Sequence, residues 1–406
     1  MEGFGEGSEM FEYPHFEHSM DEVRRAGVVI SGALVWTDET APAIREAFSI
    51  ANSWRDAHAY PMRSIRFSLL HHLRHQKLNG FTAARLKRMQ AIRRKLRRMK
   101  DRNRPVEFHE LQDLGGCRAI MNTMEDVRAL VKVLKERLPH DRWGEDDYIS
   151  RPKKDGYRSH HLKFAFKGRG TRALHNGRRI EVQVRTSLQH SWATAVEAVG
   201  LVRGEDLKGS DGSENWLRLF RLMSAEFAEA EKCRPPRGLP DHKERMREIR
   251  ELERELDAVD TLDNLSHAFD WNKEAVRPSQ KPSHYLISYD RQTKKVTVLP
   301  YYKAALAAAG YDNAEASDNR SGAETSNVVL VEVDKLDNLE RAYPNYFGDV
   351  QLFKEQLRQL TRGRAVDEYT VARQQAVASK PRENPDPSWI GRRGRWTEPK
   401  RRRPRT

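Results

Sequence analysis

The chain has 406 residues, of which 38% are hydrophobic and 33% charged, and its formal net charge is +14. No apolar run approaches the ~18–20 residues that a membrane helix needs, which argues against a membrane protein. Two cysteines, Cys117 and Cys233, give neither a disulfide framework nor a zinc site. The cysteine content and an acidic N-terminus unlike a signal peptide favour a cytoplasmic protein. The length is sufficient for two or three compact units.

The positive charge is concentrated in two blocks. From Lys380 to Thr406 there are ten Lys or Arg and three acidic residues, and Arg85–Arg104 is also strongly basic. Such blocks favour polyanionic partners such as nucleotides or RNA. A solvated surface explains the tail equally well.

The N-terminal third is predicted to be mainly helical. Residues 1–27 are expected to be weakly ordered, and Val28–Val35 to form a strand or an extended arm. The apolar spacing predicts helices at Thr40–His58, at Pro61–Gln76 and at Phe81–Asp101, the last with an apolar stripe on a basic background.

The middle of the chain alternates strand and helix patterns. The elements that we expect here are, in order, strand Cys117–Met121, helix Met124–Leu138, strands Leu162–Phe166 and Arg179–Arg185, and helices Thr186–Val199, Trp216–Lys232 and Lys243–Leu265. Glycines and Asn176 between the second and third strands predict a hairpin.

The pattern changes after Pro282. We expect a hairpin of Tyr285–Tyr289 with Val296–Pro300, a helix at Tyr301–Ala309, a strand at Asn327–Val333, and helices at Leu336–Arg341 and Gly348–Leu360. That ββαβα order predicts a second, small α+β domain. The Pro- and Arg-rich tail beyond it is predicted to be disordered.

Two acidic residues mark the chemistry. Asp113 and Glu181 each lie on or beside a predicted strand, and a loop rich in Lys, Gly and Tyr lies between them. Two carboxylates on neighbouring strands can hold a divalent metal, and a basic aromatic loop can hold a nucleotide. Gln183 and Arg185 follow Glu181 on the same strand face.

The motifs from Phe81 to Glu197 resemble the synthetase domain of the RelA/SpoT family, which makes guanosine tetra- and pentaphosphate. They are Arg85-Leu86-Lys87, Asp113 with Arg118, Lys153–His161, and Glu181-Val182-Gln183-Val184-Arg185. The resemblance implies a nucleotidyltransferase-like mixed sheet flanked by helices, in an overall α+β chain. It suggests a small alarmone synthetase or one of its toxic relatives.

By this resemblance, Asp113 and Glu181 would bind Mg²⁺, and Glu181 would also be the base that deprotonates the attacking hydroxyl. The residues implied for ATP binding are Arg85, Lys87, Lys95 and Arg118. Those implied for the acceptor are Lys153, Asp155, Gly156, Tyr157 and His161, with Tyr157 stacking on the base. Gln183, Arg185 and His190 would support the site, and Trp192 is predicted to be a core residue.

One position departs from the family pattern. Asp155 stands where Asn is usual, and an extra negative charge near a guanosine diphosphate is unfavourable. The acceptor therefore has two interpretations, a guanosine nucleotide (GDP or GTP) or, as in toxic relatives, the 3′ end of tRNA or an adenosine nucleotide. A regulator that binds nucleotides without catalysis is a third hypothesis.

The predicted organisation is an N-terminal arm (1–35), a synthetase domain (36–232), a helical linker (233–275), a C-terminal accessory domain (276–365) and the tail (366–406). The accessory domain could neutralise the enzyme or bind a protein trigger, and its aromatic turn Ala342–Phe347 is a docking candidate. We expect no hydrolase activity, since the one His140-Asp141 pair lies in a predicted loop. The family also includes oligomers.

Overall fold

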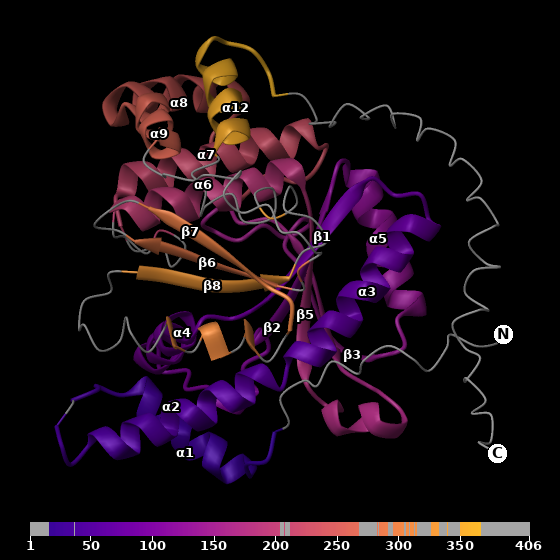
Figure 1. Ribbon diagram of the computed structural model, residues 1–406. Coiled ribbons are helices and arrows are strands. Elements are labelled where there is room, and N and C mark those ends of the chain that lie inside the picture. Colours follow the sequence, from indigo (N-terminus) through magenta and orange to yellow (C-terminus); the bar gives the residue numbers. More distant parts are fainter. Residues whose placement is uncertain are drawn as a thin grey trace, which may run out of the picture. The chain divides into compact units, whose positions relative to one another are not determined.

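The computed structural model describes residues 16–366 apart from 36, 204–206, 208–211, 268–281, 283, 291–294, 304–305, 308, 312, 315–325, 333–338 and 340–349. Within this part, one mixed sheet of eight strands forms the centre, in the order β3-β4-β5-β2-β1-β8-β6-β7 (Figure 1). The strands are β1 Gly80–Leu86, β2 Gly115–Met121, β3 Asp141–Asp147, β4 His160–Ala165, β5 Arg179–Thr186, β6 His284–Asp290, β7 Val296–Tyr301 and β8 Ser326–Glu332. The expected α+β class and mixed sheet with flanking helices are therefore confirmed.

The strand alternation gives the sheet one apolar and one polar face. In β5, Ile180, Val182 and Val184 are fully buried, whereas Glu181 and Gln183 between them are only partly covered. The apolar face packs against α3 (Ala59–His75) and α5 (Met124–Arg137), which lie along the same side of the sheet (Figure 1). Because successive side chains of a strand point to opposite faces, the polar set shares the other face.

The N-terminal helices are α1 (Met20–Ser31) and α2 (Ala41–Asp56), and they pack with α4 (Met89–Asp101) in a second core. The prediction of a strand or extended arm at Val28–Val35 was wrong over its first part. Ser19 and Glu22 form a reciprocal cap, and Val23, Ala26 and Ile30 recur at helical spacing and are buried. These two signals start a helix eight residues before the β-branched run.

The predicted helix Phe81–Asp101 is a strand followed by a helix. Residues from Gly80 to Leu86 form β1, which pairs antiparallel with β2 along its whole length, and α4 begins only at Met89. The stripe of Met89, Ile92 and Leu96 is real and buried. Leu86 matched its spacing by coincidence.

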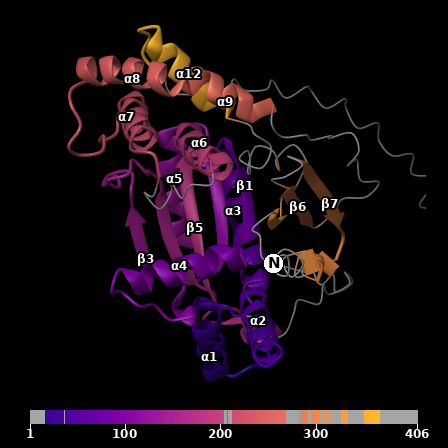
Figure 2. The ribbon, with the colours of Figure 1, turned by 90° about the vertical axis from the view of Figure 1, so that its left-hand side faces the viewer.

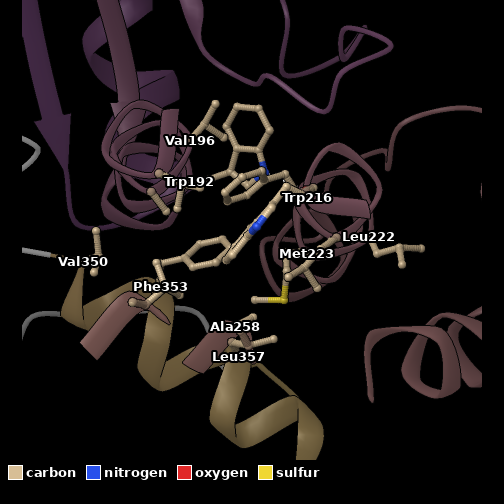
Figure 3. Packing of buried hydrophobic residues seen from close by; sticks show 14 of the residues in the cluster. Trp192, Val196, Trp216, Leu222, Met223, Ala258, Val350, Phe353 and Leu357 are labelled. Atoms are coloured by element: carbon tan, nitrogen blue, oxygen red, sulfur yellow. Dashed lines mark hydrogen bonds between the residues drawn. The ribbon is translucent and has the colours of Figure 1, made fainter. Parts of the chain in front are cut away.

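A helical layer lies beyond one end of the sheet. It consists of α6 Ser187–Arg203, α7 Glu214–Ala230, α8 His242–Leu256, α9 Ala258–His267 and α12 Gln351–Thr361. Figure 2 shows α8, α9 and α12 beyond α6 and α7, at the end opposite to α1 and α2. In its core, Phe353 of α12 packs beside Trp192 and Trp216 (Figure 3). The single helix expected at Lys243–Leu265 is interrupted at Asp257, which has a left-handed φ of 47°.

The C-terminal strands continue the central sheet. β8 pairs with β6 on one side and with β1 on the other, through Ala84↔Glu332 and Arg85↔Val331. Glu332 lies on the face of the sheet that packs against α3 and α5. There Arg66 of α3 contacts it at 3.1 Å in a buried ion pair. The strands expected in the C-terminal segment are thus present, and they belong to the same sheet as β1 to β5. The helix α12 packs in the helical layer. The domain boundaries stay predictions.

Several predicted elements fall outside the described residues, namely the helix at Leu336–Arg341 for the most part, the turn Ala342–Phe347, and the tail beyond residue 366. Besides β1, the strand β3 was not predicted, since His140-Asp141 was read as a loop and β3 begins at Asp141. None of the helices in the described ranges is long and apolar enough to cross a membrane.

Candidate active site

The two candidate metal ligands lie at neighbouring positions of the polar face. Glu181 is in β5, opposite Gly116 of the parallel strand β2, and Asp113 precedes the start of β2 by two residues. Burial raises the pKa of Glu181 and the negative charge of Asp113 adds to that effect, as expected for two carboxylates at one site. The structure therefore brings together the two acids that are 68 positions apart in the chain.

Asp113 is held by two lysines. Lys87 Nζ lies 2.8 Å from Oδ2 and Lys95 Nζ 2.9 Å from Oδ1. Burial raises the pKa of the Asp113 carboxyl, but the two ammonium groups outweigh burial and hold that pKa well below its usual range. Lys87 follows β1 and Lys95 is in α4, so the strand-to-helix turn that was not predicted is what brings both lysines to one carboxylate.

Glu181 is held by a histidine and an amide side chain. His161 Nδ1 lies 2.9 Å from Oε1, and Gln183 Nε2 donates to Oε2 at 2.9 Å. Burial raises the pKa of Glu181, yet His161 and Gln183 bring it down to about 2. Such a carboxylate is ionised at neutral pH and suits a cation better than a proton.

The hydrogen bonds continue from Glu181 in both directions. Arg185 Nη2 donates to Gln183 Oε1 at 3.2 Å, and the hydroxyl of Tyr157 lies 2.8 Å from His161 Nε2. Burial lowers the pKa of the Arg185 guanidinium. A continuous series of side-chain contacts thus links Tyr157, through His161, to the candidate metal ligand Glu181.

The predicted acceptor loop forms a tight turn. Gly156 N–H donates to the carbonyl of Lys153 at 3.0 Å, and Lys153 N–H donates to that of Tyr157 at 3.2 Å. Asp155 Oδ1 accepts from the backbone N–H of Tyr157 at 2.9 Å. An Asn side chain has an equivalent Oδ1 acceptor. Asp in place of the usual Asn therefore preserves the turn.

Gly156 is required at its position. Its φ is 98°, and a Cβ there would lie 3.1 Å from side-chain atoms of both Ser224 and Trp192. Ser224 Oγ donates to the Gly156 carbonyl at 2.5 Å, and Trp192 Nε1 donates to the carbonyl of Phe220. The loop is therefore pressed against α7, and Trp192 is a core residue as predicted.

Two tyrosines, Tyr148 and Tyr157, form an aromatic pair at the predicted acceptor loop. The ring of Tyr148 meets that of Tyr157 edge-on at 5.9 Å, and Lys153 Nζ lies 4.3 Å from the Tyr148 ring and 5.0 Å from the Tyr157 ring. Burial, together with Asp146, raises the pKa of Tyr148 to about 12. Tyr148 was not singled out from the sequence. The sequence feature that could have indicated it is its position after Asp146 and Asp147, next to a basic loop.

The two arginines that were predicted to bind ATP, Arg85 and Arg118, also lie on the polar face of the sheet. Arg85 pairs in register with Gly116, and Arg118 pairs with Gln183 on one side and with Ala83 on the other. Directly opposed residues of neighbouring strands point to the same face, so Arg85 lies in the row of Glu181 and Arg118 in the row of Gln183. His190 is buried in the first turn of α6, and its role stays a prediction.

A buried network behind the loop had no sequence signal. Glu231, just after α7, accepts hydrogen bonds from Arg158, Thr186 and Gln189, the last at 3.0 Å. The Arg158 and Glu231 side chains are 2% and 0% exposed. Since Arg158 follows Tyr157 and Thr186 ends β5, Glu231 fixes the loop to the strand that carries Glu181.

The donor set fits Mg²⁺. Both carboxylates are ionised and offer hard oxygen atoms, and magnesium is commonly bound by one or two carboxylates together with substrate phosphates. Asp113 and Glu181 are the residues that would hold it.

Comparisons with known proteins place this site in a named region. Residues 84–200 match the model described as the region found in RelA / SpoT proteins. The GTP pyrophosphokinase of Escherichia coli K12 is 27% identical over 140 residues, which are 33% of this chain and 18% of the relative. The GTP pyrophosphokinase YjbM of Bacillus subtilis is 29% identical over 117 residues, 28% of this chain and 53% of the relative.

Solved structures of low identity were also found. A GTP pyrophosphokinase family protein of Streptococcus pneumoniae is 22% identical, with 55% of this chain and 98% of that chain covered and a TM-score of 0.36. Small alarmone synthetase 1 of Bacillus subtilis, bound to its product pppGpp, is also 22% identical, with 34% and 74% covered and a TM-score of 0.30.

The extent of these matches is limited. The chain spans less than a fifth of the first curated relatives and about half of the Bacillus protein. All four motifs that carry the resemblance lie in or at the edge of the matched segment. What the comparisons show is therefore that residues 84–200 of this chain match the region found in RelA / SpoT proteins.

Proposed function

We propose that this chain is an ATP-dependent pyrophosphokinase that transfers the β,γ-pyrophosphate of ATP to the 3′-hydroxyl of a guanosine nucleotide. The observation that carries the proposal is the two-sided site. Asp113 is held by Lys87 and Lys95 on one side, and Glu181 is joined to Tyr157 through His161 on the other. A group transfer between two bound substrates needs such a donor side and an acceptor side.

On the donor side, the lysines would bind the triphosphate as point charges, and Arg85 and Arg118 would face the adenine, since guanidinium planes stack well on purines. Lys87 and Lys95 contact Asp113. Phosphate oxygens would compete for the same ammonium protons, which would release Asp113 to bind the metal. Mg²⁺, once bound, supplies charge neutralisation for the phosphates.

On the acceptor side, Tyr157 would stack on the base and Glu181 would lie near the 3′-oxygen. That oxygen attacks the β-phosphorus, the bond from the β-phosphorus to the oxygen of the α-phosphate breaks, and AMP leaves. The hydroxyl proton passes to Glu181. A carboxylate whose pKa is about 2 accepts a proton only weakly, so weakening of the His161 or Gln183 contact on substrate binding would favour this step.

Transfer to the 3′ end of tRNA is the second acceptor hypothesis, and the structure reduces one of its supports. Of the basic block, Arg93 Nε donates to the carbonyl of Ile30 at 2.8 Å, and Arg97 donates to those of Ser31 and Gly32. These arginines satisfy carbonyls at the C-terminal end of α1, so their charges have a structural use. They need no RNA to account for them.

The test offers γ-labelled ATP and magnesium to purified full-length protein with GDP, GTP, AMP, ATP or deacylated tRNA, and separates the products on thin layers. Label in a guanosine nucleotide, lost in Glu181→Gln and kept in the matched surface variant Glu125→Gln, is the expected result. Label in tRNA or in an adenosine nucleotide alone would replace the acceptor. No transfer to any acceptor would contradict the proposed activity and leave nucleotide binding without catalysis.

A further inference from the structure

A second concave site lies on the other face of the sheet. A cavity of about 700 Å³ is bordered by α5, by β3 and β4, and by the residues that follow α7. His160 lines it, whereas its neighbour His161 contacts Glu181, and consecutive strand residues point to opposite faces. The cavity shares no residue with the site of Asp113 and Glu181.

The cavity walls are basic and come from separate elements. Its basic lining residues are Arg128, Lys132, Lys135, Arg142, Lys232 and Arg234, and its acidic ones are Glu136 and Asp147, which leaves a formal excess of four positive charges. Lys135 and Arg142 share Glu145 as their partner, at 2.9 and 2.7 Å. Asp147 is engaged in its own turn, where it accepts from Ile149 and Ser150.

Four of the six cations have no such partner. Within the described part of the chain, Arg128 and Lys132 on α5, and Lys232 and Arg234 after α7, form no ion pair and are exposed. Like charges held around one concavity without counterions repel one another, and an anion between them would relieve the repulsion.

The floor of the cavity is apolar. Met124, Val127, Val131 and Ile149 line it, and each is less than 9% exposed. Ligand pockets of about 300–1,000 Å³ combine an apolar lining with a few polar groups that orient the ligand. A concave site with an apolar floor suits a small molecule that has both a ring and phosphates. An extended phosphate backbone would call for a longer and flatter basic surface.

We propose that this cavity binds a nucleoside polyphosphate, with its base on the apolar floor and its phosphates between the α5 wall and the Lys232–Arg234 wall. The proposal concerns binding alone and does not depend on whether the opposite face transfers pyrophosphate.

The test is calorimetric titration of full-length protein with ADP, with inorganic pyrophosphate and with a single-stranded RNA oligonucleotide, all at low ionic strength. All proteins carry Lys87→Ala and Tyr157→Ala, which weaken the donor and acceptor sides of the other site. Each wall is then reversed separately, by Arg128→Glu with Lys132→Glu or by Lys232→Glu with Arg234→Glu. Arg137→Glu, an exposed arginine of α5 outside the cavity, is the matched control.

Each double variant should weaken ADP binding by roughly tenfold or more, and Arg137→Glu should leave it unchanged. ADP should bind more tightly than pyrophosphate because only ADP covers the floor. The proposal is overturned if both double variants bind ADP as the control does, or if pyrophosphate binds as well as ADP. It is also overturned if the double variants lose only a single-stranded RNA oligonucleotide and retain ADP, which would make this face an RNA surface.

Discussion

The buried pair of Arg158 and Glu231 offers a quantitative test of how the acceptor loop is fixed. Glu231→Gln keeps the shape of the side chain and removes its charge, which leaves the Arg158 guanidinium buried without a counter-charge. Removal of one partner from a buried pair costs about 3–5 kcal/mol, because the remaining charge is no longer compensated. We expect the free energy of unfolding to fall by that amount.

The assay is urea unfolding of Glu231→Gln, Arg158→Met and the double variant. Because the double variant buries no unpaired charge, it should lose clearly less stability than the two single losses added together. Glu255→Gln, which removes the charge of an exposed carboxylate that accepts from Asn215, is the control and should cost less than about 1 kcal/mol. A loss below about 1 kcal/mol for Glu231→Gln, or strict additivity, would refute the reasoning.

Three further outcomes are expected. Gly156→Ala should lower the melting temperature and the transfer rate together, since a Cβ at φ 98° adds about 1–2 kcal/mol of strain and contacts α7; unchanged values for both would contradict this. The pKa of Glu181 is lowered to about 2, so its stabilising contribution, roughly 3 kcal/mol, is complete above its ordinary pKa of 4.5 and is lost as the pH falls towards 2. Unfolding free energies measured from pH 5 to pH 2 should therefore fall less steeply in Glu181→Gln, and equal slopes would count against it. Arg97→Ala should cost about 0.5–1 kcal/mol in urea unfolding, because two exposed carbonyls near the end of α1 lose a charged donor, with the KM for ATP unchanged; a raised KM would assign Arg97 to the substrate.

Some of this structure could be read from local pattern and some could not. The strands β2, β4 and β5 combine apolar residues with a period of two, and α5 has both a cap and a stripe, so their positions were predicted closely. β3 has the sequence Asp-Arg-Trp-Gly-Glu-Asp-Asp and lies at the sheet edge, where little is buried and no apolar alternation is needed. β1 is identified by its pairing with β2 and β8, which is a contact and not a sequence pattern.

The site divides in the same way. Glu181, Gln183 and Arg185 follow from strand periodicity, whereas the link between Tyr157 and His161 was not predicted from the sequence. The pairing of Asp113 with both lysines depends on a turn that the helical stripe concealed. Glu231 is 73 residues from Arg158, and a buried ion pair at that separation leaves no trace in local composition.

The junction between β1 and β8 bears on any attempt to dissect the protein by truncation. A chain that ends after residue 277 would lack β8, and the end of β1 that carries Arg85 would become a bare sheet edge, with backbone donors and acceptors open to another molecule. It would also leave Arg66 without Glu332. A shortened protein would therefore differ from the full chain in the shape of the proposed ATP side and in its tendency to aggregate. Single substitutions on β8, such as Val331→Thr, separate the contribution of the C-terminal segment from the loss of a neighbouring strand.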